Sequence, residues 1–172
     1  MDYNVSDLLR QPIGTTRDHD VDAEPCLTLD DDLAAGVMGG RVRLERTSGG
    51  TRASGVVRAT VTLPCARCLE PVPAILEIPF EEEFAPSVDP TTGRPLPEPE
   101  DDLIFTIDAH QTLHLDEAVR QNLIAALPIQ PLCRLDCAGL CPACGSNRNA
   151  APCACVLDEG HRPFAALADL LH

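Results

Sequence analysis

The sequence has no lysine and no tryptophan, and only one tyrosine and four phenylalanines among its 172 residues. This scarcity of aromatic rings argues against a base-stacking platform for nucleic acids, because such platforms depend on several exposed rings. No apolar run approaches the ~20 residues of a membrane span, and the first residues lack the basic head and apolar stretch of a secretory signal. We therefore expect a soluble, cytoplasmic protein with no membrane partner.

Positive charge is also scarce. Thirteen arginines accompany 27 acidic residues, which gives a net charge of −14. Six of the arginines lie between residues 36 and 69 with one acidic residue, whereas residues 1–35 and 70–117 are strongly acidic. An anionic surface repels phosphate backbones and attracts basic proteins. Solubility alone also explains such a surface, so the charge favours a basic partner without requiring one.

Alternating apolar and polar residues predict a β-rich body over residues 1–132. RVRLER and VRATVTL form a hairpin around the turn TSGGT, and a third strand runs from Val72 to Phe80. Two short strands, LIFTID and TLHL, follow later in the chain. A short helical turn fits residues 5–10, and a longer helix near residues 117–127 has Asp116 as its expected N-cap.

Between these elements, residues 85–102 contain five prolines and no apolar period, which indicates a mobile acidic loop. The cysteine-rich segment occupies residues 133–156, and a helix over residues 157–172 is expected to dock on the body. The fold class is therefore α+β. We expect an antiparallel β-sheet or partly closed barrel with a few short helices and a cysteine-rich zinc-binding loop near the C-terminus.

Cysteine is what the chain has in excess. Six of its nine cysteines lie in CRLDCAGLCPACGSNRNAAPCAC, residues 133–155. Disulfides do not persist in a reducing cytosol, and an odd number of thiols leaves one unpaired, so metal ligation explains the clustering better. Cys26 stands alone in a polar segment, and we expect it to be a small buried residue with no ligand role.

Zinc prefers four thiolate or imidazole ligands in a tetrahedron, and a C-x2-C turn supplies two thiolates without straining the backbone. Cys141 and Cys144 form such a turn, with Gly145 able to adopt a positive φ behind it. Cys153 and Cys155 follow after a small polar loop. These four cysteines predict a locally closed zinc site.

Two further pairs remain, Cys65 with Cys68 and Cys133 with Cys137. They form a second site if the segment after the helix crosses the end of the hairpin. A rival grouping exchanges the pairs and joins CARC to CPAC, and the spacing does not decide between the two. All-cysteine zinc sites have no open position for water, so each grouping indicates a structural metal and not a catalytic one.

No pattern of a known catalytic class is present in the sequence. The motif PCARC fits half of the nucleobase-deaminase signature, but no H-x-E precedes it. A redox dithiol would lie at the start of a helix in a βαβ unit, whereas this motif ends a predicted hairpin. Iron–sulfur ligation is also not favoured, because the cysteine spacing does not match that of ferredoxins. Phosphate-binding glycine loops, H-E-x-x-H and G-x-S-x-G are absent. We therefore expect neither an enzyme nor a small-molecule substrate.

The order of the motifs resembles one family. A hairpin that ends in CARCLE, the helix DEAVRQNLIAALP and the segment CAGLCPACG are similar to the bacterial YceD family, which is named for large-subunit ribosomal RNA accumulation and has relatives in plant organelles. The resemblance implies a non-enzymatic factor in the synthesis, processing or stability of large-subunit ribosomal RNA and in ribosome assembly. It also implies a basic, zinc-bearing ribosomal protein of the large subunit as partner, because the genes of the two commonly adjoin.

From the residues alone, the alternative is a zinc-ribbon nucleic-acid-binding protein or transcription regulator. That function needs a basic recognition surface, and in the cysteine-rich segment Asp136 offsets Arg134 and Arg148. For direct contact with ribosomal RNA, the candidates are the arginines on the polar face and at the end of the hairpin: Arg41, Arg43, Arg58 and Arg67. Alternatively, these arginines pair with the acidic strand that carries Glu77 and residues 81–83.

Overall fold

The computed structural model describes residues 1–22, 24–30, 33–97, 99, 104–151 and 153–155. The chain divides into two compact units. The first unit comprises Met1–Leu63 and Pro73–Ile129, and the second comprises Pro64–Val72 and the described residues from Gln130 onward. Residues 64–72, expected to be part of the β-rich body, thus group with the cysteine-rich segment.

The elements follow one another as β1 (Asp2–Asn4), α1 (Ser6–Leu9), β2 (Thr16–Val21), β3 (Glu24–Asp30), β4 (Leu33–Arg46), β5 (Thr51–Pro64), β6 (Pro71–Pro86), β7 (Phe105–Ile107), β8 (Thr112–His114) and α2 (Asp116–Ala126). The predicted hairpin is β4 and β5, the third strand is β6, and α1 is the short helical turn expected near the start. None of the described helices is long and apolar enough to span a membrane.

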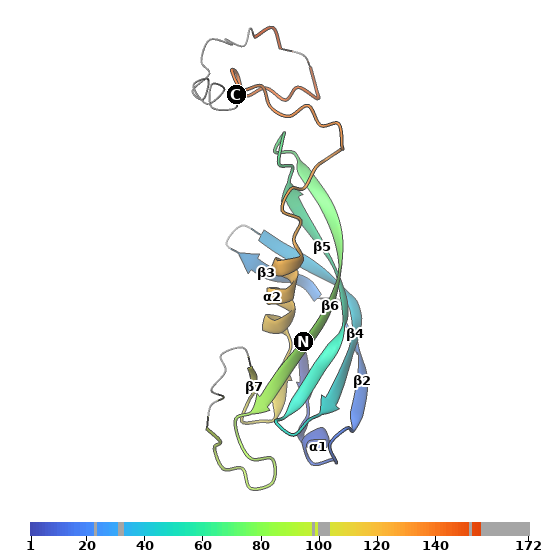
Figure 1. Cartoon of the computed structure of the whole chain (residues 1–172), viewed down its shortest axis with the longest axis vertical. Helices are drawn as coiled ribbons and strands as arrows, with labels where there is room; N and C mark the ends of the chain where they lie inside the picture. The colour runs from blue at the N-terminus through green and yellow to red at the C-terminus, as the bar shows by residue number, and fades with distance from the viewer. Residues whose placement is uncertain (23, 31–32, 98, 100–103, 152, 156–172) are drawn as a thin grey trace, which may run out of the picture. The chain divides into compact units, whose positions relative to one another are not determined.

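The strands of the first unit make two sheets (Figure 1). β1 pairs with β8, and the larger sheet has the order β2-β4-β5-β6-β7, with β3 also paired to β4. β4 is antiparallel to β2, β3 and β5, but β6 and β7 are parallel, with Phe84 opposite Phe105. The expectation of an antiparallel sheet is therefore wrong at this edge, because the long connection after β6 returns the chain before β7 begins. The described strands make no closed barrel.

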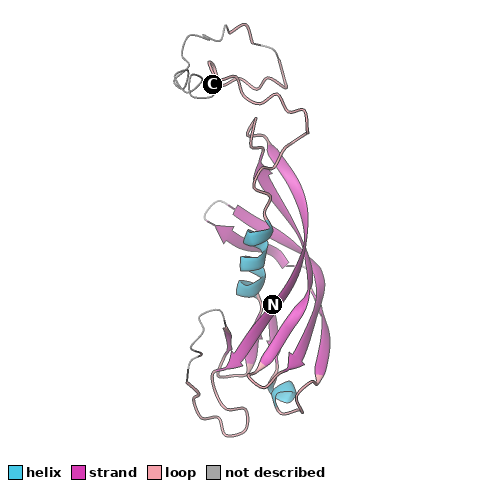
Figure 2. Cartoon of the chain, in the orientation of Figure 1, coloured by secondary structure: helices cyan, strands magenta, loops and turns pink. Residues whose placement is uncertain are grey.

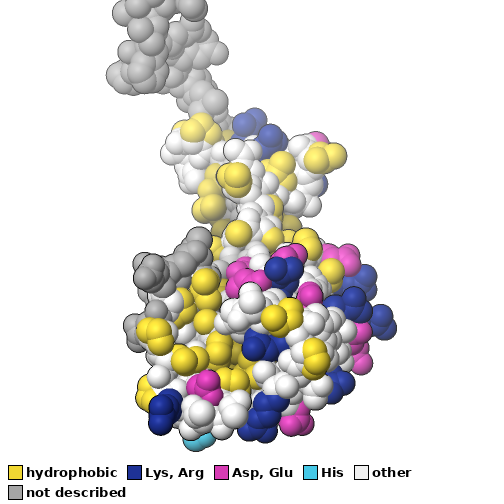
Figure 3. Space-filling view, turned by 60° about the horizontal axis from the view of Figure 1, so that its bottom comes forward, with side chains coloured by type: hydrophobic (Ala, Val, Ile, Leu, Met, Phe, Trp, Pro, Cys, Tyr) yellow, Lys and Arg dark blue, Asp and Glu magenta, His cyan; other side chains and the backbone are white. Residues whose placement is uncertain are grey.

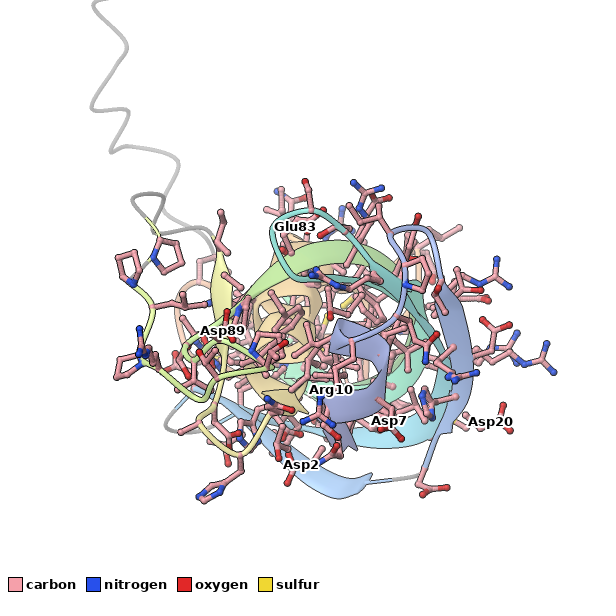
Figure 4. All side chains as sticks on the ribbon, turned by 90° about the horizontal axis from the view of Figure 1, so that it is seen from below. Asp2, Asp7, Arg10, Asp20, Glu83 and Asp89 are labelled. Atoms are coloured by element: carbon pink, nitrogen blue, oxygen red, sulfur yellow. The ribbon has the colours of Figure 1, made fainter. Side chains whose placement is uncertain are left out.

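One face of the larger sheet is apolar because side chains alternate along each strand. On β4, Val42 and Leu44 are each 1% exposed, whereas Arg41 and Arg43 face solvent. The helix α2 lies near this sheet and contacts β3, and Figure 4 shows the strands curving around it. The core is thus built from aliphatic residues, as the low aromatic content requires.

The helix α2 begins one residue before the predicted bounds. Asp116 is its first residue and not its N-cap, which is Leu115, and no side chain caps the helix. Asp116 and Glu117 in the first turn still favour the positive end of the helix dipole. Burial of Val119 and Leu123 supplies its tertiary packing.

Three predicted features lie partly or wholly outside the described residues. In the proline-rich loop, Val88 pairs with Pro95, and Asp89 accepts hydrogen bonds from the N–H groups of Thr91 and Thr92, while residues 98 and 100–103 lie outside the described residues. The helix predicted over residues 157–172 also lies outside them. The side chain of Cys26 does so too, so its expected burial stays a prediction.

The Thr51 side chain is fully buried at the start of β5, and its hydroxyl has no hydrogen-bond partner among the described residues. An unpaired buried polar group costs about 1–3 kcal/mol. We expect Thr51→Val to raise the free energy of unfolding by about 1 kcal/mol, measured by urea denaturation. Thr62→Val, on the exposed face of the same strand, is the control and should change it by less than about 0.5 kcal/mol. A less stable Thr51→Val protein contradicts this expectation.

His114 on β8 lies between two carboxylates. Its Nδ1 is 2.8 Å from Oδ1 of Asp2, and its Nε2 is 3.3 Å from Oδ2 of Asp108. The hydrogen bond to Asp2, with a further one to Asp108, raises the pKa of the imidazole. Because its pKa is higher in the folded state, the protonated imidazole stabilises the fold. This contribution is complete at pH values below the ordinary pKa of about 6.5, and it is lost as the pH rises through the folded-state pKa.

We therefore expect the difference in stability between the unmodified protein and His114→Gln to shrink between about pH 5.5 and about pH 8.5. The change should be about 0.5 kcal/mol, because the imidazole is half exposed and solvent screens the pair. Thermal unfolding at both pH values measures it. His110→Gln is the control, since the His110 ring makes no ion pair with the described residues. A difference that grows with pH would contradict the assignment.

Candidate metal centre

Eight cysteines of the second unit form two groups. The first cluster is Cys65, Cys68, Cys133 and Cys137, and the second cluster is Cys141, Cys144, Cys153 and Cys155. Within each cluster the four sulfur atoms all lie within 4.8 Å of one another. The geometry thus follows the first of the two groupings considered from the sequence and not the exchange that joins CARC to CPAC.

The spacing of the sulfur atoms fits a four-thiolate metal site. A tetrahedral zinc ion with bonds of about 2.3 Å holds its sulfur ligands about 3.8 Å apart. In the first cluster, Cys65 and Cys137 are 3.9 Å apart and Cys68 and Cys133 are 3.6 Å apart, sulfur to sulfur. These separations are far longer than a disulfide bond of about 2.05 Å, and all eight thiols are free. Each cluster can therefore hold a metal ion.

The first C-x2-C turn is closed by two backbone hydrogen bonds. The N–H of Leu69 donates to the carbonyl of Cys65 at 3.0 Å, and the N–H of Cys65 donates to the carbonyl of Glu70 at 2.8 Å. Leu69 takes the left-handed conformation that this closure needs, with φ of 62°. The turn points two sulfur atoms to one side, as shared ligation requires.

The second C-x2-C turn repeats this pattern. The N–H of Gly145 donates to the carbonyl of Cys141, and the N–H of Cys141 donates to the carbonyl of Ser146, both at 2.8 Å. Gly145 has φ of 71°, which agrees with the positive φ expected from the sequence. The two turns therefore share one local structure, with leucine in the first where the second has glycine.

Asn149 connects the loop of the second cluster to the first cluster. Its Nδ2 donates to the sulfur of Cys137 at 3.2 Å, and its Oδ1 accepts hydrogen bonds from the Ala138 N–H and from Arg134. Asn147 in turn accepts from the Asn149 amide. We predicted this stretch only as a polar loop. The two asparagines in this loop, Asn147 and Asn149, could have indicated such contacts, but the sequence spacing does not show which groups they bind.

Arg67 also has a structural role in the second unit. Its guanidinium donates to the carbonyl of Cys137 at 3.0 Å, and its own carbonyl accepts the N–H of Leu140. Arg67 thus supports the first cluster, and it belongs to a different unit from the other three candidate RNA-binding arginines. Apart from the last residue of β5, the first two residues of β6 and an isolated bridge between Leu140 and Asn147, the described part of the second unit consists of loops and turns (Figure 2).

The four thiols of a cluster do not ionise alike. N–H groups of Arg67 and Cys133 donate to Cys65 and lower its pKa to about 6, whereas loss of hydration raises that of Cys133 to about 12. In the second cluster, the hydroxyl of Ser146 lowers the pKa of Cys144 to about 6, and hydrogen bonding to Cys144 raises that of Cys155 to about 12. Binding of a divalent ion by all four thiolates therefore releases protons.

The other candidate arginines lie on the outer face of the larger sheet in the first unit. Arg41, Arg43 and Arg58 line an open hollow of about 1050 Å³. Each is paired with an acidic residue: Arg41 with Asp20 at 3.6 Å, Arg43 with Asp18 at 2.7 Å and Arg58 with Glu77 at 3.4 Å. Figure 3 shows arginine and acidic side chains next to one another on this unit, and Figure 4 shows Asp20 on the outside of the sheet.

Pairing with the acidic strand β6 is therefore observed for Arg58, whereas Arg41 and Arg43 pair with β2, a strand that the sequence did not predict. The charges that line the hollow balance, and no aromatic ring other than the imidazole of His19 lines it. The hollow thus lacks both the net positive charge and the stacking rings of a typical single-stranded RNA surface.

A protein-family model described as large ribosomal RNA subunit accumulation protein YceD matches residues 53–171. An uncharacterized protein of Mycobacterium tuberculosis is 36% identical over 107 residues, which cover 60% of this chain and 48% of the relative. The chloroplastic large ribosomal RNA subunit accumulation protein YCED homolog 1 of Zea mays is 28% identical over 143 residues, covering 66% of this chain and 47% of the relative. The chain spans about half the length of these relatives. No solved structure matches.

Proposed function

The chain belongs to the YceD family, which is linked to accumulation of large-subunit ribosomal RNA, and on this premise we propose that it is a non-enzymatic zinc-binding factor in ribosome assembly. In this role it supports the synthesis, processing or stability of large-subunit ribosomal RNA in the cytoplasm. The observation that carries the proposal is the family match over residues 53–171, which includes all eight clustered cysteines.

Zinc is the metal that best suits the two clusters. Four cysteine sulfur atoms in a tetrahedral arrangement are typical of structural zinc sites, and the spacing of these cysteines does not match ferredoxin runs. When bound, zinc supplies a closed cross-link between ligand loops and has no open position for a substrate. Asn149 and Arg67 orient Cys137 through their hydrogen bonds. The two C-x2-C turns orient one pair of cysteines in each cluster, Cys65 with Cys68 and Cys141 with Cys144.

The direct partner in this proposal is a basic protein of the large ribosomal subunit. The first unit holds 22 acidic residues and nine arginines, so it carries −13 of the net charge of −14. Figure 4 labels five of its acidic side chains, those of Asp2, Asp7, Asp20, Glu83 and Asp89, together with Arg10. Such a surface attracts a cationic partner.

Direct contact with ribosomal RNA is secondary in this proposal. The arginines Arg41, Arg43 and Arg58 are candidates for phosphate contact, because exposed ion pairs contribute little and can be exchanged at low cost. The neighbouring acidic side chains nevertheless oppose an approaching phosphate. We therefore expect RNA to associate mainly through the ribosomal protein.

The test is purification of tagged chain with its partners at about 0.05 M and about 0.5 M salt, before and after nuclease treatment. We expect basic large-subunit proteins to remain bound after nuclease treatment at low salt and to dissociate at high salt. Loss of the chain from the cell should lower large-subunit ribosomal RNA relative to small-subunit ribosomal RNA. Recovery of only DNA or polymerase subunits, with an unchanged RNA ratio, contradicts the proposal.

A further inference from the structure

The two clusters differ in how far their ligands are removed from solvent. In the first cluster, three of the four cysteines are at most 4% exposed and apolar side chains pack against them, whereas the fourth, Cys133, is exposed. In the second cluster Cys141 is buried, Cys153 is partly exposed, and Cys144 and Cys155 are exposed. The second cluster therefore has one buried ligand, against three in the first.

Burial of the ligands determines how readily a thiolate site exchanges its metal, because the shell around a site controls what reaches the ion. An incoming thiol loses its proton as its sulfur binds the ion, and a resident cysteine leaves and takes up a proton. Each step forms one metal–sulfur bond and breaks one, and no electrons are transferred. A site with three buried ligands resists such replacement, whereas Cys144 and Cys155 of the second cluster can be replaced in succession.

The loop between the two ligand pairs of the second cluster is anchored by contacts that do not involve its own sulfur ligands. The N–H of Arg148 donates to the carbonyl of Gly139 at 2.9 Å, and the amide of Asn149 donates to the sulfur of Cys137 at 3.2 Å. Both acceptors belong to the segment that carries the first cluster. That segment therefore holds the loop in place after an ion has left the second cluster, and a preorganised loop can bind the next ion at lower cost.

The clusters also differ in what their ligands join along the chain. Cys68 and Cys133 of the first cluster are 65 residues apart, whereas the second cluster lies entirely within residues 141–155. Loss of the first ion releases two distant segments from one another, and loss of the second opens one short local loop. The first cluster is thus the one on which the structure of the second unit depends.

We propose that the second cluster is a metal-exchange site, which passes its zinc ion to incoming cysteine thiolates, while the first cluster keeps its ion as a fixed cross-link. The exposed Cys144 and Cys155 leave the ion first, and the buried Cys141 leaves it last. This inference goes beyond the role in ribosome assembly and rests only on the zinc binding proposed above. The incoming thiolates belong to another protein or to a small thiol, and the chemistry of the exchange is the same for both.

The test starts from the full chain loaded with two equivalents of zinc and adds a metal-free four-cysteine zinc-finger peptide as acceptor. We expect one equivalent to move to the peptide about tenfold faster than the other or more, at a rate that rises with peptide concentration. Alkylation followed by mass spectrometry should then label the second cluster and leave the first cluster protected. Transfer of both equivalents at one rate, labelling of the first cluster before the second, or a rate independent of the peptide overturns the inference.

A second arm replaces the peptide by reduced glutathione at the same thiol concentration, with a zinc indicator dye to record release. Faster transfer with the peptide identifies protein cysteines as the acceptors, and faster release with glutathione identifies a small thiol. If neither accelerates loss of the ion, the ion does not leave by ligand exchange and the inference is wrong.

Replacement of Cys144 and Cys155 together by serine tests whether the second unit survives without its second ion. We expect this variant to hold one equivalent, to lose the fast phase of transfer, and to resist proteolysis within residues 64–72 and 130–140. An unfolded second unit in this variant shows that the second ion is structural and overturns the inference. Two equivalents that stay in place in the unmodified chain refute only the exchange site, whereas a chain that binds no zinc refutes the proposed zinc-binding function as well.

Discussion

Replacement of Cys68 and Cys137 together by serine is expected to unfold the second unit and to lower its metal content from two equivalents to one or fewer. The reason is the small apolar content of that unit. Its described core consists of three buried cysteines with Val72, Leu132 and Leu140 packed around them, and the described part has no helix. We therefore expect metal binding to supply most of its folding free energy, as in zinc-finger peptides, where the apparent value is about 10–16 kcal/mol.

Metal analysis and limited proteolysis measure this effect. Cleavage should appear within residues 64–72 and 130–155, while the sheet of the first unit, whose core is independent of the clusters, stays resistant. Cys26→Ser, at the cysteine predicted to have no ligand role, is the control and should keep both equivalents. A double-serine chain that binds two equivalents and resists cleavage would show that the first cluster is not a metal site.

Replacement of Asn149 by alanine is expected to weaken metal binding at the first cluster by about tenfold or more, although Asn149 belongs to the loop of the second cluster. The amide Nδ2 donates to the sulfur of Cys137, and Oδ1 accepts from the N–H of Ala138 next to it. Residues that hydrogen-bond to metal ligands orient them, so loss of these contacts leaves Cys137 free to turn away. The two clusters should therefore bind metal cooperatively.

Competition between the chain and a chelator, followed by absorption of bound cobalt(II), measures the two affinities. Asn149→Asp should also weaken binding, because it keeps the acceptor Oδ1, loses the donor to Cys137 and adds negative charge beside the thiolate. Arg148→Ala is the control, since only the backbone of Arg148 makes a hydrogen bond among the described residues. Unchanged affinity at the first cluster in Asn149→Ala would mean that the clusters are independent.

The elements with a clear period were predictable from the sequence. Val42 and Leu44 alternate with arginines, and this pattern gave β4 and β5, while the spacing of Val119 and Leu123 gave α2. β2 was missed because TRDHDV has no apolar alternation: five of its six residues are exposed, and its backbone pairing with β4 holds it in the sheet. A strand that is stabilised mainly by backbone pairing has no distinctive pattern of apolar residues from which it could be predicted.

The grouping of the candidate ligands was predictable from the sequence, but the contacts that support them were not. Ligand spacing identified the eight cysteines, and the structure brings them together in two groups of four. Spacing cannot show that Asn149 reaches Cys137, because this contact depends on how the loop after Cys144 folds back. It also did not reveal the left-handed Leu69, since sequence rules expect glycine at that position.

The most direct test of the central claim is the metal content of the full chain, purified without added metal and measured by elemental analysis together with thiol reactivity. The account predicts two equivalents of zinc per chain, with the eight clustered cysteines unreactive until the metal is removed. A chain that contains no zinc, or contains iron in its place, with freely reactive clustered thiols would contradict it.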